Sequence, residues 1–422
     1  MNGKIIGIIL GITALLALGA YVGRGYLLRQ FFAPQVPENA RQLLPTADTA
    51  ATPDTASKAP SVPNMEVVAS DLTIPWELVF LPSGEMLVTE RPGRLLKIGT
   101  DKTTIPISGV QHIGEGGLLG MALHPNFAQN QYLYLYLTTQ TGNGLTNRVE
   151  RYTFTGTALT NRTPIIENIP GAQYHDGGRI AFGPDGLLYI TTGDAGVEES
   201  SQDTSNLAGK ILRVRDDGSI PADNPFGNAV YSYGHRNPQG LTWDNAGNLW
   251  ATEHGRSGAR SGFDEVNLIE AGKNYGWPTI EGDETRAGME TPRAHSGATT
   301  TWAPSGMTFF DGNLLFAGLR GQSLYKAEVD AWIPVRQLAE SPGMNRWIPD
   351  QVRDDSGGVV QNNDKNAGLT VIPYAATEFG RLRTVTVGPD GLLYILTNNQ
   401  DGRGTPRPGD DKIIRLNPAI LD

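Results

Sequence analysis

One histidine stands in a glycine-rich segment whose residue types suit acid–base chemistry. His175 lies just before Gly177 and Gly178, and a turn followed by an apolar run leads on to Asp194. A histidine and an aspartate at adjacent strand ends can meet as a general base and the group that orients it. A lone histidine is more often structural, but the two glycines let a ligand or another backbone segment approach closely. We therefore take His175 and Asp194 as a candidate catalytic pair.

Two further pairs of side chains could bind an anion. Arg236 and Asn237 are adjacent in a polar segment and can present a cation and an amide to an anionic or carbonyl-bearing ligand. The alternative is a structural arginine that donates to loop carbonyls. Arg381 and Arg383 would share one face of a strand, because side chains alternate along it. Two neighbouring cations repel unless an anion lies between them, so exposure at the rim is the alternative.

Adjacent acidic residues suggest a cation site. Asp264 and Glu265 precede a loop rich in glycine and asparagine. Carboxylates combined with backbone carbonyls suit a hard cation such as calcium. The spacing is not that of an EF-hand, and a solvated acidic turn is the equal alternative.

The composition excludes several kinds of site. The net charge is −10 with no basic stripe, which argues against nucleic acid as a partner. The absence of cysteine excludes disulfides, thiolate zinc sites and cysteine nucleophiles. The six histidines include no pair with the spacing of a zinc protease, which argues against a zinc enzyme.

A turn followed by an apolar strand recurs along the chain. Glycine and Asx residues tolerate positive φ, so these phrases predict hairpins. Their spacing is that of a four-stranded blade with a variable loop. We predict an all-β fold, a six-bladed β-propeller of four-stranded antiparallel blades, whose repeated phrases are residues 81–90, 124–137, 182–191, 243–252, 309–318 and 387–396.

The ends and one internal segment differ from this pattern. Residues 1–32 contain an uncharged apolar run over 5–22, which predicts a signal peptide or a membrane anchor, and we expect an exported, periplasmic protein. Residues 33–64 are rich in Pro, Ala and Thr and predict a disordered linker. The propeller would occupy 65–422, with an inserted surface loop around 340–374 that is polar and lacks alternation.

Taken together, these phrases resemble the soluble aldose sugar dehydrogenases that depend on pyrroloquinoline quinone (PQQ), within the glucose/sorbosone dehydrogenase family. The resemblance covers about residues 67–416. It implies a six-bladed propeller that oxidises aldose sugars to lactones with PQQ and calcium, and passes electrons to an external acceptor. The motifs that carry the resemblance are residues 114–120 with 124–127, 175–194, 206–213, 234–241 and 264–278.

The resemblance also implies roles for single residues. His175 would take the proton of the anomeric hydroxyl as hydride passes to the quinone, and Asp194 would hold the imidazole. Arg236, with Asn237 beside it, would stabilise charge on the reduced quinone. The remaining implied contacts are Arg320, Arg381 and Arg383 for the cofactor, the carbonyls of Gly255 and Arg256 for a calcium ion under the quinone, and Asp264, Glu265 and Tyr275 for a second, structural calcium.

Two residues depart from the family pattern. Glu115 stands where the glucose dehydrogenases have a glutamine near substrate and cofactor, and Tyr174 replaces an acidic residue beside the histidine. A carboxylate at position 115 could weaken cofactor binding or change the pH profile.

Two alternatives to the dehydrogenase are an extracellular propeller that binds a partner without chemistry, and a calcium-dependent lactone hydrolase, which would need carboxylates around the channel.

Overall fold

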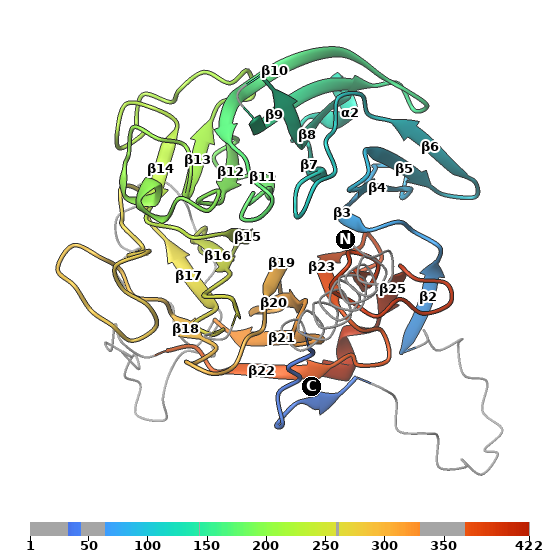
Figure 1. Cartoon of the computed structure of the whole chain (residues 1–422). Coiled ribbons are helices and arrows are strands. Elements are labelled where there is room, and N and C mark those ends of the chain that lie inside the picture. The colour runs from blue at the N-terminus through green and yellow to red at the C-terminus, as the bar shows by residue number, and fades with distance from the viewer. Residues whose placement is uncertain (1–32, 44–63, 143, 259–260, 330–367, 422) are drawn as a thin grey trace, which may run out of the picture.

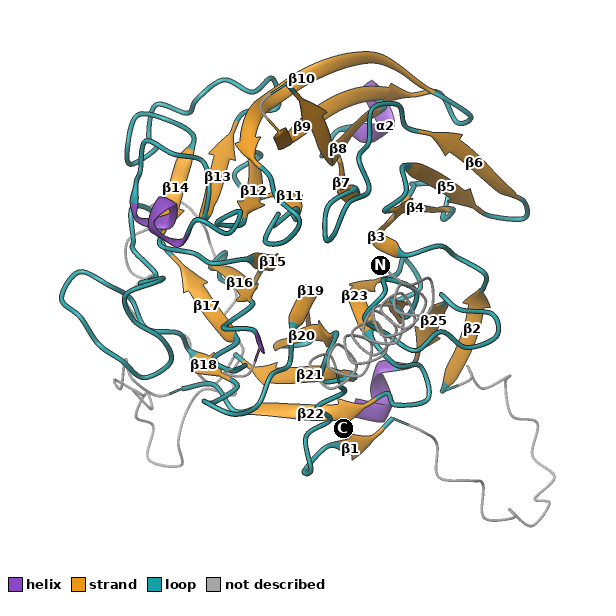
Figure 2. Ribbon diagram, viewed as in Figure 1, coloured by secondary structure: helices purple, strands orange, loops and turns teal. Residues whose placement is uncertain are grey.

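Six β-sheets surround a central axis in the computed structural model, which describes residues 33–43, 64–142, 144–258, 261–329 and 368–421 (Figure 1). Strands and loops make up nearly all of this part of the chain, with α2 (Phe127–Asn130) as a single helical turn and η1 (Glu198–Gln202) as a short 3-10 segment (Figure 2). The predicted all-β, six-bladed propeller is confirmed.

Each blade has four antiparallel strands, which lie side by side in order from the axis to the outer edge of the ring. The first three blades are β3 (Pro75–Phe80), β4 (Met86–Glu90), β5 (Arg94–Ile98) and β6 (Lys102–Pro106); β7 (Leu118–Leu123), β8 (Tyr132–Thr141), β9 (Gly144–Phe154) and β10 (Leu159–Pro170); and β11 (Ile180–Phe182), β12 (Leu188–Thr192), β13 (Lys210–Val214) and β14 (Val230–Tyr233).

The other three blades repeat the arrangement. They are β15 (Pro238–Trp243), β16 (Leu249–Glu253), β17 (Glu265–Ile269) and β18 (Ala294–His295); β19 (Pro304–Phe310), β20 (Asn313–Gly318), β21 (Ser323–Glu328) and β22 (Val371–Ala375); and β23 (Leu382–Val387), β24 (Leu393–Thr397) and β25 (Ile413–Leu416) with β2 (Met65–Ala69) outermost.

The two ends of the propeller meet in its last blade. Strand β2 pairs antiparallel with β25, so that Met65 lies opposite Leu416. Apolar side chains then fill the spaces between neighbouring blades. In one such cluster Tyr134 and Tyr136 of the second blade pack with Ile190 of the third, and all three are buried. A similar cluster joins the sixth blade to the first, so the core is a closed ring.

The repeated sequence phrases all fall at the same place in a blade. Each one is the hairpin between the two innermost strands, for example the turn from β3 to β4 or from β23 to β24. In an antiparallel blade the loop after the second strand and the connector that enters the first strand emerge at the opposite end. That opposite face of the ring therefore collects the connectors and the second loops of all six blades.

Part of the predicted linker is ordered, which corrects the sequence analysis. Strand β1 (Arg41–Gln42) adds to the outer edge of the fifth blade, parallel to β22, and the following Leu43 is buried. The pairing satisfies a strand edge that would otherwise be open. Residues 44–63 and 1–32 lie outside the described residues. The described residues include no helix that is long and apolar enough to cross a bilayer.

The predicted insertion is shorter at its end than the sequence indicated. Residues 371–374 belong to β22, because their backbone pairs with β21. The polar stretch before them, residues 340–367, lies outside the described residues.

Glycines on the inner strands allow the blades to approach the axis closely. A Cβ on Gly120 of β7 would overlap the carbonyl oxygen of Gly178, to which the Gly120 N–H donates at 3.0 Å. We expect Gly120→Ala to destabilise the fold by about 1–3 kcal/mol through overpacking. The measurement is the thermal unfolding midpoint against a Gly142→Ala control, where a Cβ meets open space. Equal midpoints for the two variants would contradict the close packing.

Candidate active site

The predicted site residues gather on the face that carries the connectors. His175 lies between β10 and β11, and Arg236 lies between β14 and β15. Asp194 follows the second strand of its blade, β12, and Arg381 precedes β23. Residues from three different blades, the third, fourth and sixth, thus share one end of the channel because of strand direction alone.

His175 and Asp194 form the predicted pair. The imidazole Nδ1 is 2.7 Å from Asp194 Oδ1, and the carboxylate is fully buried. Burial would raise the pKa of Asp194, but the hydrogen bond and charge of His175 and the Gly196 N–H outweigh it and lower that pKa. An ionised carboxylate only accepts, so Nδ1 carries the proton of the neutral imidazole. The second nitrogen, Nε2, then has the lone pair of a base.

Glu115 fixes the backbone of this histidine. Its Oε2 accepts the His175 N–H at 2.9 Å, and its Oε1 accepts from Arg403 Nη1 at 2.6 Å. Burial opposes ionisation, but the charges of Arg403 and His175 hold the pKa of Glu115 well below its usual range. The departure at this position is therefore compensated within the chain, because Arg403 neutralises the carboxylate.

Arg236 and Asn237 are held by a carboxylate that the sequence analysis did not single out. Glu253, at the end of β16, accepts from the backbone N–H groups of both residues. The Arg236 guanidinium reaches the His254 carbonyl at 3.4 Å and Ser257 Oγ at 3.3 Å, while its Nε has no partner. Asn237 Oδ1 accepts from Gly177 N–H at 3.0 Å, and its Nδ2 is buried without a partner. Loop carbonyls therefore do not satisfy all the hydrogen-bond donors of Arg236 and Asn237, unlike in the alternative of a purely structural arginine.

The same glutamate belongs to a second imidazole–carboxylate pair. His235 Nδ1 is 2.8 Å from Glu253, and its Nε2 is 2.9 Å from Ser232 Oγ. The hydrogen bonds from serine to histidine to carboxylate are those of a hydrolytic triad. All three side chains are buried, with Ser232 and His235 wholly inaccessible, so no substrate reaches the hydroxyl. Its role is to support the Arg236 loop.

Arg381 and Arg383 are buried and not exposed at the rim. Arg381 Nη2 donates to Asp401 at 2.9 Å, and Arg383 Nη1 donates to Gln239 Oε1 at 2.8 Å across the channel. Burial and then the charge of Arg91 lower the pKa of Arg383. Each of the two guanidinium groups keeps a buried Nε without a hydrogen-bond partner. Asp401 offsets part of their repulsion.

A pocket on the axis joins these groups to two residues that were not among the predicted site residues, Arg91 and Asp176. The Nε atom of Arg91, which follows β4, is buried without a hydrogen-bond partner, and the Oδ2 atom of Asp176 is buried without one as well. Burial raises the pKa of Asp176 to about 7. Arg91 comes from a single position after β4 that no local motif marks, whereas Asp176 lies next to His175 within the glycine-rich segment. The pocket is lined by Trp76, Arg91, Glu115, Asp176, Gly177, Gln239, His254, Leu319, Arg383 and Arg403.

Arg320 has partners that the sequence did not predict. Its Nε donates to the Ala33 carbonyl at 3.0 Å and its Nη1 donates to Ser261 Oγ at 2.8 Å. Gln35 also accepts from Thr301 N–H. The N-terminal segment therefore contacts the loops next to Arg320 and holds its guanidinium.

The two acidic residues have different surroundings, because Asp264 lies just before β17 and Glu265 is the first residue of that strand. Both oxygens of Asp264 accept from the protein, from Gly255 N–H at 2.8 Å and from Ala303 N–H at 2.8 Å among others. Glu265 lies opposite Glu253 on β16. The Tyr275 hydroxyl donates to the Leu268 carbonyl at 2.6 Å. The side chains of Asp264, Glu265 and Tyr275 thus have separate partners.

Two further observations bear on a cation. The Arg256 carbonyl accepts from Gly262 N–H at 3.2 Å, so one predicted ligand already has a donor. Burial and the charge of Glu253 raise the pKa of Glu265 to about 8. Among the described residues, no group of three or more acidic or histidine side chains is arranged to hold a metal ion.

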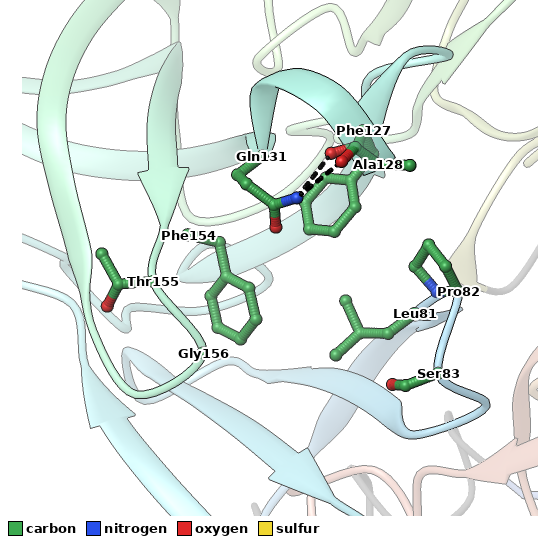
Figure 3. A pocket seen from close by; sticks show the side chains of 9 residues that line it. All are labelled: Leu81, Pro82, Ser83, Phe127, Ala128, Gln131, Phe154, Thr155 and Gly156. Atoms are coloured by element: carbon green, nitrogen blue, oxygen red, sulfur yellow. Dashed lines mark hydrogen bonds between the residues drawn. The ribbon is translucent and has the colours of Figure 1, made fainter.

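A second hollow lies between the first and second blades, at the opposite end of the ring (Figure 3). It is bounded by the β3–β4 turn at Leu81, by α2 and by the β9–β10 turn at Phe154. Its side chains are apolar or neutral, and Gln131 uses its amide to cap the carbonyl of Phe127 at 3.0 Å. It offers no acid, base or cation for chemistry.

The Glu115–Arg403 pair yields a stability prediction. We expect Arg403→Met to lower stability at pH 7 by about 1–3 kcal/mol, because it leaves Glu115 without its cation in a partly buried place. The pKa of Glu115 is depressed, so this contribution is present above its unfolded pKa, near pH 4, and is lost as pH falls below it. The deficit, measured by thermal unfolding at pH 7 and pH 4, should shrink at the lower pH. A Glu115→Gln background should also reduce it, and an unchanged deficit there would refute the pairing.

Comparison with known proteins agrees with the fold. A family model described as Glucose / Sorbosone dehydrogenase matches residues 72–414. The aldose sugar dehydrogenase YliI of Escherichia coli is 32% identical over 366 residues, which are 82% of this chain and 92% of that protein. The PQQ-bound structure of an aldose sugar dehydrogenase from Streptomyces coelicolor is 35% identical with a TM-score of 0.70, covering 84% of this chain and 97% of that one.

A further structure, the apo form of the soluble aldose sugar dehydrogenase of Escherichia coli, is 28% identical with a TM-score of 0.67 and covers 83% of this chain and 98% of that one. The family match extends over most of the propeller and includes every predicted site residue. The chain therefore belongs to the glucose/sorbosone dehydrogenase family, whose members are oxidoreductases that act on the CH–OH group of sugar donors.

Proposed function

We propose that this protein oxidises aldose sugars to lactones with PQQ as its cofactor. The observation that carries the proposal is a base, His175, that is oriented by a buried carboxylate at 2.7 Å and lies at the same end of the channel as a set of buried nitrogen donors without partners. An extracellular binding module would have no need of an oriented base. A lactone hydrolase would need carboxylates in the channel; this chain places Glu115 and Asp176 there, but it sets them among Arg91, Arg383 and Arg403.

The unpartnered donors fit an anionic cofactor. Buried polar atoms without partners cost free energy, and charged ones cost more. Arg236 Nε, Asn237 Nδ2, Arg381 Nε and Arg383 Nε are all in this condition. PQQ carries three carboxylates and carbonyl oxygens, which are acceptors for such groups. These four residues would therefore hold the cofactor, with Arg320 beside them.

In the proposed reaction the cofactor accepts the hydride, and the side chains of the protein handle the proton and the charge. When bound, PQQ supplies a two-electron acceptor for the hydride from the sugar. His175 takes the proton of the anomeric hydroxyl at Nε2, and Asp194 stabilises the resulting imidazolium. Glu115 keeps the ring in place by holding the His175 N–H, and Arg236 supplies positive charge where negative charge develops.

Calcium belongs to the same proposal. Asp264 holds the N–H of Gly255, which shapes the loop whose carbonyls would face the cation. Calcium prefers such oxygen ligands. A second ion near Glu265 and Glu253 would relieve the repulsion of two carboxylates on neighbouring strands. Export, with electrons passed to an external acceptor, completes the proposed function.

The deciding experiment is dye-linked sugar oxidation by the full-length protein. The protein would be treated with a chelator, and then assayed with and without added PQQ and calcium. Activity on aldoses that requires PQQ supports the proposal. PQQ binding without oxidation of any aldose would refute the substrate class, and no PQQ binding would refute the cofactor.

Replacement of the base should abolish turnover and spare cofactor binding. We expect His175→Ala to lower kcat by about 10²-fold or more, because the proton acceptor is lost. The measurement is the steady-state rate with PQQ bound. His295→Ala is the matched control, since that histidine lies in the outermost strand β18 and pairs with the exposed Asp283. Full activity in His175→Ala would show that the base is wrongly assigned.

Loss of a channel arginine should act on the cofactor. We expect Arg383→Met to weaken PQQ binding by about 10- to 100-fold, the equivalent of one buried charge-assisted hydrogen bond. The affinity can be followed by calorimetry on the cofactor-free protein. Arg162→Met, on the outer strand β10, is the control and should bind PQQ normally. Unchanged affinity in Arg383→Met would remove Arg383 from the cofactor site.

A further inference from the structure

Trp277 contacts both halves of the site. It follows β17 in a loop, and its indole Nε1 donates to Asp194 Oδ2 at 2.9 Å. The guanidinium carbon of Arg236 lies 5.3 Å from its ring centroid, within the range of a cation–π interaction. The same side chain therefore touches the group that orients the base and the cation that faces the cofactor.

The contact with Asp194 completes the bonding of that carboxylate. Asp194 Oδ1 accepts from His175 and from Gly196 N–H, whereas Oδ2 accepts from Trp277. A carboxylate held through one oxygen can still turn about its Cβ–Cγ bond, and a donor on the other oxygen fixes its plane. Without that donor, a fully buried anionic oxygen would lose its partner.

The Trp277 backbone is itself fastened by other loops. Its N–H donates to the Gly234 carbonyl at 2.9 Å. Its carbonyl accepts from Ser201 Oγ at 3.1 Å and from Gln202 Nε2 at 2.6 Å. The indole is thus presented to Asp194 from a loop that the third blade holds in place.

We propose that Trp277 is a positioning residue, whose indole N–H sets the plane of the Asp194 carboxylate, and through it the imidazole of His175, while its ring supports Arg236. The inference rests on the proposed role of His175 as the base. It concerns the geometry of the pair and not the identity of the sugar.

Several titratable groups surround the pair. Glu115 and His254 interact with the charge of His175, Arg236 with that of Asp194 and Arg403 with that of Glu115, and the ring centroid of Tyr174 lies 4.9 Å from that of the imidazole. Trp277→Phe alters none of these charges and keeps an aromatic ring near Arg236. A change in the behaviour of the pair would therefore report the lost N–H.

The test begins with Trp277→Phe in the full-length protein. We expect kcat to fall roughly tenfold, with KM and PQQ affinity nearly unchanged, as for the loss of one hydrogen bond to a charged group. The lost donor stabilises ionised Asp194, so the acid limb of the pH–rate profile should move to higher pH. Trp277→Leu removes the ring as well and should also weaken PQQ binding.

A second readout does not depend on sugar oxidation. In cofactor-free protein, the downfield proton resonance of His175 Nδ1–H, assigned by its loss in His175→Ala, reports the bond to Asp194. We expect this resonance to shift and to exchange faster with solvent in Trp277→Phe. Trp250→Phe is the matched control, because the Trp250 indole donates to Asp244 Oδ2 at the same 2.9 Å but at the opposite end of the fourth blade.

The outcomes separate the two proposals. An unchanged acid limb and an unchanged resonance in Trp277→Phe would overturn the positioning role. If that variant does not fold, Gln202→Met, which loosens the Trp277 carbonyl and leaves the indole intact, should produce the same shift to a smaller extent, and its absence would overturn the role equally. A shifted resonance in a protein that oxidises no aldose would sink the proposed function and leave the positioning role standing.

Discussion

The pairing of β2 with β25 closes the ring, and the site depends on that closure. Once the sheet is circular, every innermost strand runs in the same direction along the axis. The connectors and second loops of all blades must then emerge together, which brings His175, Arg236 and Arg383 to one end. The apolar clusters between neighbouring blades keep this arrangement rigid, since each blade is packed on both sides.

The channel is the place where this rigidity is used. Buried charges there are held in fixed positions by other side chains, such as Asp401 for Arg381 and Gln239 for Arg383. The protein does not satisfy them all, because Nε of both arginines has no partner. Buried donors without hydrogen-bond partners lower the stability of the protein by itself and favour the binding of an anion. Glu115 has partners for both oxygens, since Arg403 neutralises it and its second oxygen fixes the backbone of the base.

Features that are formed within one short segment of the chain could be predicted from the sequence. The Asp-Gly and Asn-Gly turns predicted the inner hairpins, and the glycines after His175 indicated a base close to other groups. The contacts that were missed each join distant parts of the chain: Arg403 with Glu115, Trp277 with Asp194, and β1 with β22. Composition alone made the segment around Arg41 resemble a linker, although the open edge of β22 gives it a partner.

The sequence by itself therefore determined the blades, their number and the types of residue that carry the chemistry. It did so because hairpin turns and strand alternation are local properties of the backbone. Only the tertiary structure decided which charges meet and which remain unpaired, because those distances depend on closing the ring. It also separated Asp264 from Glu265, because Asp264 lies before β17 and accepts from Gly255 and Ala303, whereas Glu265 lies on β17 opposite Glu253. The adjacency that suggested one cation site in the sequence thus became two environments in the fold.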